Sequence, residues 1–174
     1  NYEKSDMINT VAILETVSYF ISSKITNHRL MVELEHASRH DALTGLHNRN
    51  ACMEKIDFLT KYSSSVGIVY ADVNGLKEIN DTLGHQAGDA ALRQAARLLT
   101  KCYGLENTYR IGGDEFLVLV PLVTELDFKT SVCRLRELVA GKADLSIAIG
   151  SEWVADTAHL ERVITKTDQR MYCD

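Results

Sequence analysis

The chain has 174 residues with 19 basic and 24 acidic side chains, so its formal net charge is −5, and 45% of its residues are apolar. This length fits one globular domain with an appended segment, and the apolar fraction suffices for a buried core, which excludes a disordered chain. The acidic balance argues against nucleic acid as a partner, because a general grip on a phosphate backbone needs basic residues. Any anionic ligand must therefore be held by local groups or by a metal ion.

The cysteines and the early apolar stretch indicate in which cellular compartment this segment lies. The four cysteines form no Cys-x-x-Cys pair, which favours reduced thiols and a cytoplasmic setting. The apolar stretch 11–21 is interrupted by Glu15 and Ser18 and is too short to span a bilayer. No signal peptide precedes it. We therefore expect no direct membrane contact from this segment.

The first predicted element is a long helix. From Asp6 to about Ser38 the sequence contains no glycine or proline, and apolar residues recur at a spacing of four and three. Such a helix cannot bury its apolar residues alone, so it packs either on its own domain or against a second copy. Its length favours pairing, although packing on the domain stays an alternative. Because the chain starts at Asn1 and stops directly after an amphipathic segment, we expect it to be part of a longer protein.

The remaining elements alternate between helices and strands. In chain order we expect a helix at about 49–61, a strand at 66–71, a short helix at 75–81, a helix at 86–100, hairpin strands at 108–111 and 115–120, a helix at about 127–140, a strand at 144–149 and a helix at 157–172. Gly112 and Gly113 separate the hairpin strands and are able to adopt positive φ angles. The pattern predicts an α/β fold with a mixed antiparallel and parallel sheet flanked by helices, in the style of a split βαβ unit.

Acidic residues stand at the ends of two predicted strands. Asp72 follows the apolar run 66–71, where a carboxylate is costly unless a charged group meets it. Asp114 and Glu115 follow the hairpin glycines directly. If these strands are neighbours, the carboxylates converge and repel each other unless a hard cation such as Mg²⁺ lies between them. Considered alone, acidic residues near turns are most often only solvated, so that alternative stays open.

The segment 80–89 is polar and punctuated by glycine. Asn80 offers a donor and an acceptor, and Asp89 accepts two donors, which is what recognition of a guanine edge requires. Lys77, one helical turn before Asn80, would then reach a phosphate. The alternative interpretation is an ordinary loop with helix caps at Asp81 and Asp89.

The residues from Arg110 to Phe116, RIGGDEF, resemble the signature of the GGDEF family, the diguanylate cyclases. Other blocks are similar to those of the family at the usual spacing. They are Asp41 to Arg49, Asp72 to Asp81, Gly84-His85, Gly88-Asp89, Ala148 to Gly150 and Thr167 to Tyr172. The resemblance covers about residues 41–172 and implies the GGDEF fold, which is similar to the palm and nucleotidyl-cyclase domains.

The resemblance implies an activity and partners. Diguanylate cyclases condense two GTP molecules into cyclic di-GMP and release two pyrophosphates, with Mg²⁺ or Mn²⁺ as cofactor. Each GTP needs the 3′-hydroxyl of the other, so a head-to-head homodimer is required. We expect residues 1–39 to be a signalling and dimerisation helix joined to an upstream sensor, and residues 40–174 to be the cytoplasmic cyclase domain. The rival is a catalytically silent regulatory module that binds GTP or cyclic di-GMP.

The resemblance also implies roles for particular residues. Asp72, Asp114 and the Val73 carbonyl would bind the metal, and Glu115 would lie at the reacting centre together with the two aspartates. The remaining positions would bind the substrate. These are Asn80 and Asp89 for guanine, Lys77 for a phosphate, and Gly112 and Gly113, which leave room for the nucleotide.

Three departures from the family pattern matter. Leu76 and Asn74 replace a frequent Phe and a frequent Asp, and neither position is expected to carry the metal. The inhibitory product site of the family is an Arg-x-x-Asp motif, and the matching positions here are Tyr103 and Glu106. We therefore expect no feedback inhibition through that site. Lys166 and Arg170 only approximate the basic residues near the closing block that contact phosphates in the family.

Overall fold

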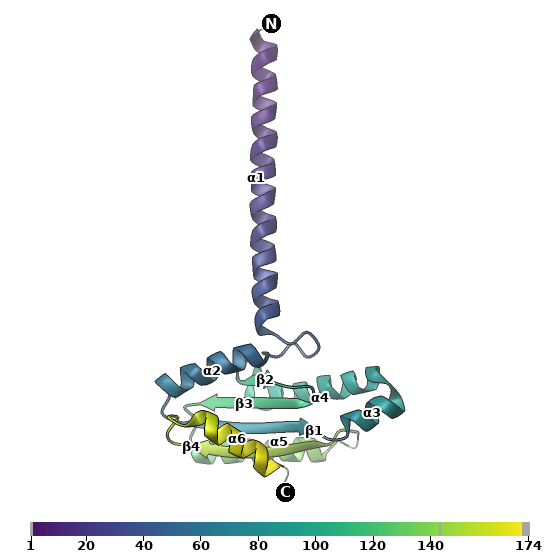
Figure 1. The fold of residues 1–174 in the computed structure, drawn as a ribbon, viewed down its shortest axis with the longest axis vertical. Coiled ribbons are helices and arrows are strands. Elements are labelled where there is room, and N and C mark those ends of the chain that lie inside the picture. The colour runs from purple at the N-terminus through teal and green to yellow at the C-terminus, as the bar shows by residue number, and fades with distance from the viewer. Residues whose placement is uncertain (1, 143, 172–174) are drawn as a thin grey trace. The chain divides into compact units, whose positions relative to one another are not determined.

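The computed structural model describes residues 2–142 and 144–171, with side chains described for 15–35, 38–142, 144–164 and 167. The chain divides into two compact units, residues 1–38 and residues 39–174. The first unit is formed by the helix α1 (Tyr2–Arg39), which confirms the long helix expected from the sequence (Figure 1). The described apolar side chains of this helix are exposed, among them Val17, Phe20 and Leu34.

The second unit contains the alternating elements. They are α2 (Arg49–Tyr62), β1 (Val66–Val73), α3 (Leu76–Leu83), α4 (His85–Tyr103), a 3₁₀ turn (Leu105–Asn107), β2 (Thr108–Arg110), β3 (Glu115–Pro121), α5 (Glu125–Ala140), β4 (Ile147–Val154) and α6 (Leu160–Met171). Each predicted helix and strand is present. The prediction was wrong about the extent of two strands, because β1 continues through Val73 and the last strand begins only at Ile147.

The four strands form one sheet in the order β2-β3-β1-β4. Every ladder between these strands is antiparallel. Strands β1 and β2 therefore run in the same direction with β3 between them, which is the split βαβ arrangement. The α/β class and the flanking helices are confirmed. The expected mixture of antiparallel and parallel ladders is corrected, since among the described residues parallel pairing is limited to an isolated bridge between His47 and Tyr109.

Helices cover both faces of the sheet, with α6 in front of it and α4 and α5 behind it in Figure 1. Since side chains alternate along a strand, each strand contributes to both faces. The face under α4 and α5, here called the α4/α5 face, buries Val69, Ala71, Val73, Phe116 and Val118 of the strands. The opposite α2/α6 face buries Val66, Ile68, Tyr70, Leu117 and Leu119.

Local signals explain where two of the helices begin. The Asn48 side chain accepts a hydrogen bond from the Ala51 amide at 3.1 Å, so Asn48 caps α2 as predicted. Thr124 caps α5 in the same way through the Asp127 amide at 3.2 Å. These caps satisfy amide groups that the first turn of a helix leaves without partners.

The edge strand β4 carries the single tryptophan of the chain. Trp153 packs against the buried cluster of the α4/α5 face. Its indole N–H donates to the Val123 carbonyl at 2.9 Å. This bond ties β4 to the segment between β3 and α5.

Three of the four cysteines lie within the described part of the chain. Cys52, Cys102 and Cys133 are free thiols, and Cys173 lies outside the described residues. Burial raises the pKa of Cys52 to about 12. Within the described ranges, no helix has both the length and the apolar character needed to cross a membrane.

Candidate active site

The acidic residues predicted to converge lie at one corner of the sheet, where β1 ends and β3 begins. Asp72 and Glu115 are direct partners in the antiparallel register, so their side chains leave the same face of the sheet. The Val73 amide donates to the Asp114 carbonyl at 3.1 Å, which brings the Asp114 backbone to the same corner. Asp72 is also the one residue of β1 that is not fully buried. The sheet register thus joins positions that are far apart in the sequence.

The Glu115 carboxylate is held between a hydroxyl group and a glycine. The Tyr70 hydroxyl donates to Oε1 of Glu115 at 2.7 Å. A Cβ atom added to Gly112 would overlap Oε2 of the same carboxylate. The hairpin predicted from the sequence is present. The reason given for its two glycines, a positive φ angle, is wrong, because neither Gly112 nor Gly113 has a positive φ. Gly112 is required here for the close approach of a carboxylate.

An ion pair between Arg110 and Asp41 supports the hairpin turn. Nη1 of Arg110 donates to both carboxylate oxygens of Asp41, at 2.9 and 3.1 Å, and Nη2 donates to the Gly113 carbonyl at 2.6 Å. Burial, the largest single influence, raises the pKa of Asp41, but hydrogen bonds from Thr44 and Arg110 outweigh it and lower the pKa overall. Asp41 is therefore a charged partner that fixes Arg110 under the turn.

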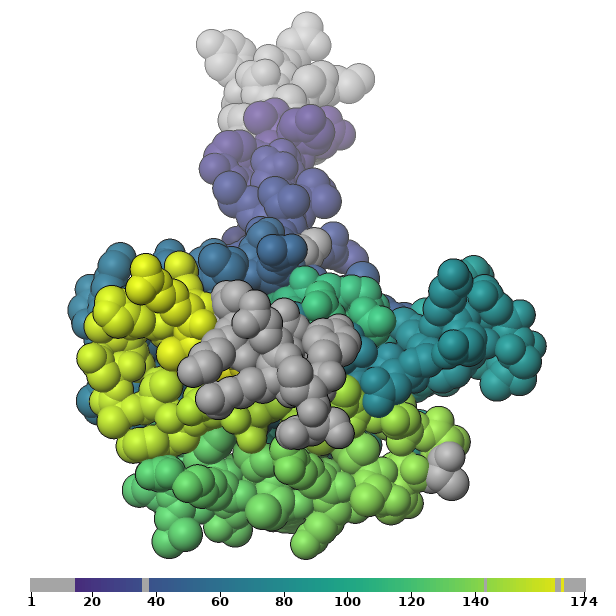
Figure 2. Space-filling model, turned by 60° about the horizontal axis from the view of Figure 1, so that its bottom comes forward, coloured from purple at the N-terminus to yellow at the C-terminus, as the bar shows by residue number. Residues whose placement is uncertain are grey.

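The polar segment 80–89 is helical rather than a loop. Gly84, with φ 84° and ψ 161°, alone separates α3 from α4. Asp81 lies within α3 and Asp89 within α4, so the interpretation of these residues as helix caps is wrong. Helix α3 has no fully buried residue and protrudes from the unit, as the teal region in Figure 2 shows.

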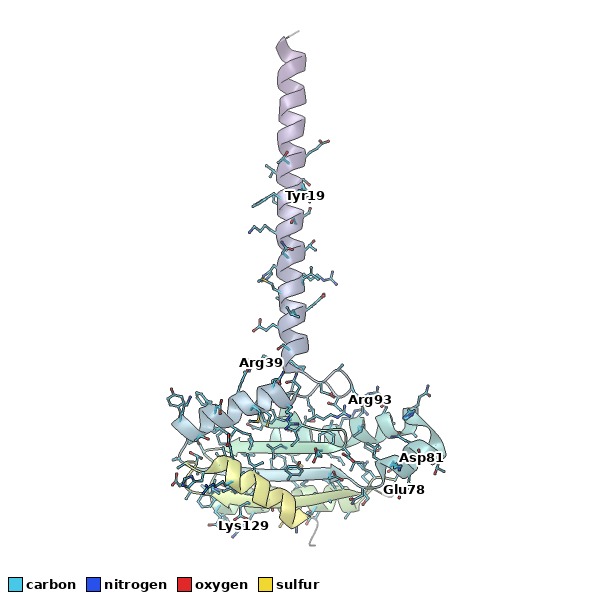
Figure 3. The ribbon with its side chains drawn as sticks, in the orientation of Figure 1. Tyr19, Arg39, Glu78, Asp81, Arg93 and Lys129 are labelled. Atoms are coloured by element: carbon cyan, nitrogen blue, oxygen red, sulfur yellow. The ribbon has the colours of Figure 1, made fainter. Side chains whose placement is uncertain are left out.

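The predicted guanine-binding residues come from both of these helices. Oδ1 of Asn80 lies where a Cβ of Gly88 would be, so Asn80 packs directly on α4 at Gly88, the residue before Asp89 in the sequence. The Asp89 carboxylate is 3.7 Å from the Arg93 guanidinium. Lys77 is exposed on the first turn of α3 and forms no ion pair among the residues whose side chains are described. In Figure 3, Arg93 of α4 is labelled toward the same end of the unit as Glu78 and Asp81 of α3.

The positions that replace the Arg-x-x-Asp motif form no basic and acidic pair. Tyr103 is buried, and burial raises the pKa of its hydroxyl to about 12. Glu106 is exposed on the 3₁₀ turn, next to Gly104. The side chains of Lys166 and Arg170 lie outside the described residues, so the prediction for these two stands untested.

A cavity of about 430 Å³ opens on the α2/α6 face beside the corner. Tyr70, Glu115, Ile111 and Leu117 contribute from the sheet and its turn. Residues of α2 and α6 supply the other walls, including Arg49 and Glu161. One side of the Glu115 side chain thus borders open space rather than packed atoms.

The corner supplies oxygen donors for a metal ion but not a complete set. Among the described residues, no group of three or more histidine, cysteine or acidic side chains is arranged to hold a metal ion unaided. Mg²⁺, however, commonly takes only one or two carboxylates and completes its shell with water and substrate phosphates. Asp72, Asp114 and the Val73 carbonyl are hard oxygen donors on adjoining segments, so the donor set fits Mg²⁺ or Mn²⁺ bound together with a nucleotide.

Sequence reasoning missed the supporting residues of this corner. Tyr70 was counted only as part of an apolar strand. Its position two residues before Asp72, on the same face of β1, was the available signal. The Asp41 and Arg110 pair joins positions far apart in the sequence, and no local pattern predicts which charges meet.

The chain has relatives among known proteins. A family model described as "Diguanylate cyclase, GGDEF domain" matches residues 38–174. The cyclic di-GMP phosphodiesterase PdeB of Shewanella oneidensis is 33% identical over 121 residues, covering 69% of this chain and 13% of PdeB. The diguanylate cyclase DgcM of Escherichia coli is 30% identical over 159 residues, covering 83% of this chain and 38% of DgcM. The chain thus spans well under half the length of these relatives.

Among solved structures, the coiled coil and GGDEF domain of DgcB from Caulobacter crescentus, in complex with c-di-GMP, superposes with a TM-score of 0.79. The match covers 91% of this chain and 92% of the DgcB chain at 20% sequence identity. At this identity the likeness shows a shared fold.

Proposed function

The chain belongs to the GGDEF family of diguanylate cyclase domains, and on this basis we propose that residues 40–174 condense two GTP molecules into cyclic di-GMP and two pyrophosphates. The observation that carries the proposal is the corner at which Asp72, Asp114 and Glu115 meet. A domain that only binds a nucleotide has no chemical need for acidic residues gathered there. Since GTP is a cytoplasmic nucleotide, the proposed reaction belongs in the cytoplasm.

The acidic corner would serve phosphoryl transfer. Asp72, Asp114 and the Val73 carbonyl would hold Mg²⁺ or Mn²⁺. When bound, such an ion neutralises the triphosphate and favours attack of a 3′-hydroxyl on the α-phosphate. Glu115 would face the reacting centre, held by Tyr70 on one oxygen and confined by Gly112 at the other.

The substrate would lie along the turn and across α3 and α4. Asn80 and Asp89 would recognise the guanine edge, because an amide and a carboxylate together supply the donor and acceptors that this edge requires. Lys77 would bind a phosphate through its exposed ammonium group. Gly112 and Gly113 would leave room for the nucleotide above the hairpin.

We also propose that the reaction needs a homodimer paired through the helix of residues 1–39, which would connect the domain to an upstream sensor. Exposed apolar side chains of α1, such as Val17, Phe20 and Leu34, support this pairing, because burial of their surface in a dimer interface is energetically favourable. Each protomer would then present its GTP to that of its partner.

Incubation with GTP and Mg²⁺, followed by chromatography of the products, tests the activity. We expect cyclic di-GMP from the unmodified protein and a loss of more than about a hundredfold in Glu115→Gln, in line with removal of a group at a reacting centre. Glu125→Gln is the matched control, because Glu125 is exposed on α5 and pairs with Lys129 across one helical turn, away from the acidic corner. If the unmodified protein binds GTP or cyclic di-GMP but forms no product at concentrations that force dimerisation, it is a silent regulatory module.

Removal of residues 1–38 tests the role of the helix. Residues 39–174 form a compact unit with their own buried clusters, so the shortened protein is expected to fold. Its specific activity should fall at dilute protein and recover at high concentration. An unchanged activity at dilution would contradict the proposed pairing.

A further inference from the structure

We propose that Tyr70 is a positioning residue, which holds the Glu115 carboxylate at the reacting corner through its hydroxyl group. The inference rests on the proposed cyclase function and adds to it a residue outside the family signature.

The register of the sheet brings the two side chains together. Tyr70 and Asp72 are two residues apart on β1, so both leave the α2/α6 face. Glu115 is the direct partner of Asp72, which makes Tyr70 its diagonal neighbour across the strand pair. The resulting distance from the hydroxyl to Oε1 is 2.7 Å, the usual length of a hydrogen bond between a hydroxyl and an oxygen.

The donor is more rigid than the acceptor. Tyr70 is only 6% exposed and packs in the buried cluster of the α2/α6 face, so its ring has little freedom. A glutamate side chain rotates about three bonds and is confined only where neighbours prevent it. The hydroxyl therefore determines the position of the carboxylate rather than the reverse.

Packing alone does not confine Glu115. The backbone of Gly112 lies against Oε2, but the cavity of about 430 Å³ borders the same side chain. Without the Tyr70 hydroxyl, the carboxylate is able to turn into that cavity and away from the corner. The hydrogen bond thus prevents rotation of the carboxylate into the cavity, which Gly112 alone does not prevent.

Tyr109 shows the ordinary way in which this cluster satisfies a tyrosine. It is 2% exposed in the same buried cluster, and its hydroxyl donates to the Glu106 carbonyl at 3.1 Å. A backbone carbonyl would satisfy Tyr70 equally well. Tyr70 instead binds a carboxylate of the proposed reacting centre, and this difference supplies a matched control.

The test compares Tyr70→Phe with Tyr109→Phe, each of which removes one buried hydroxyl and keeps the ring. Initial rates are measured against GTP concentration at saturating Mg²⁺, and thermal melting checks that both variants are folded. For Tyr70→Phe we expect kcat to fall about tenfold, the usual effect of losing a hydrogen bond to a charged group, with KM nearly unchanged. Tyr109→Phe should keep both constants. Equal effects in the two variants, or an effect on KM alone, would overturn the inference.

Crystal structures of the unmodified protein and both variants supply a readout that does not depend on activity. In Tyr70→Phe the Glu115 carboxylate should move toward the cavity, and in Tyr109→Phe it should stay in place. If the unmodified protein forms no cyclic di-GMP, the proposed function fails and the structures alone decide the positioning role. A carboxylate that keeps its place in Tyr70→Phe would refute that role in either case.

Discussion

The α4/α5 face and the α2/α6 face are built from alternate residues of the same strands, yet they are filled differently. On the α4/α5 face, the ring of Phe128 from α5 occupies the space that Gly67 of β1 leaves open. On the α2/α6 face, the strand pair carries Asp72 and Glu115 at its corner, and a cavity of about 430 Å³ borders the second of these. Close packing on one face and open polar space on the other suggest that stability and chemistry are divided between them.

This division predicts that substitutions on the α4/α5 face change the free energy of unfolding more than the activity of the folded molecules. Substitutions at the acidic corner should do the opposite. Variants that alter both equally would contradict the division.

Phe128→Ala should have the largest effect on stability. Phe128 is 2% exposed, and removing a buried phenylalanine leaves a cavity that costs about 3–5 kcal/mol. The free energy of unfolding in urea measures this loss. Phe58→Ala on the exposed surface of α2 is the control, since Phe58 is 55% exposed and should change stability little.

Two glycine substitutions distinguish the faces directly. A Cβ at Gly67 would overlap the confined ring of Phe128, so Gly67→Ala should destabilise the fold by about 1–3 kcal/mol. A Cβ at Gly112 meets the end of the flexible Glu115 side chain, which is able to move. Gly112→Ala should therefore melt near the temperature of the unmodified protein but lose cyclase activity. A Cβ at Gly113 meets no atom of the protein, so Gly113→Ala should also leave the melting temperature unchanged.

Asp41→Asn should have an intermediate effect, because it weakens the support of the hairpin turn. The loss of a charged hydrogen-bond partner for Arg110 costs about 1.5 kcal/mol. Since the folded state lowers the pKa of Asp41, its contribution is present above the ordinary value of 3.8 and is lost as the pH falls through the lowered value. The stability difference between the two proteins should shrink in acid, and a constant difference down to pH 2 would contradict this origin.

The substitution His47→Gln should have the smallest effect, which is expected in the pH dependence of stability. Burial, followed by the charges of His40, Arg39 and Lys55, lowers the pKa of His47 below 6.5. Its Nδ1 atom is buried without a hydrogen-bond partner, so protonation there is unfavourable. The unfolded chain then binds a proton before the folded one, and stability should decline as the pH falls below 6.5. Melting temperatures of His47→Gln between pH 7.5 and 5 should decline less steeply than those of the unmodified protein.

Much of the fold could be predicted because its signals are local. The spacing of apolar residues marked the helices, and the two adjacent glycines marked the hairpin. The direction of the strand pairs depends on which strands become neighbours. Insertion of β3 between β1 and β2 keeps these two strands from pairing in parallel, and β4 pairs antiparallel with the other edge of β1. No local pattern contains that information.

The candidate site shows the same limit. Asp72, Asp114 and Glu115 could be selected from their positions at strand ends, and the register then brought them to one corner. Tyr70 could not be separated from an ordinary buried residue, because its role depends on a partner 45 positions later in the chain. The glycines were assigned to backbone freedom, whereas Gly112 provides space for a side chain.

The position of Trp153 gives the molecule an optical reporter of its own. As the single tryptophan, it alone determines the long-wavelength emission of the protein, and it belongs to the α4/α5 face rather than to the acidic corner. Opening of that face would expose the indole ring to water and shift its fluorescence to the red. Unfolding can therefore be followed without an attached dye.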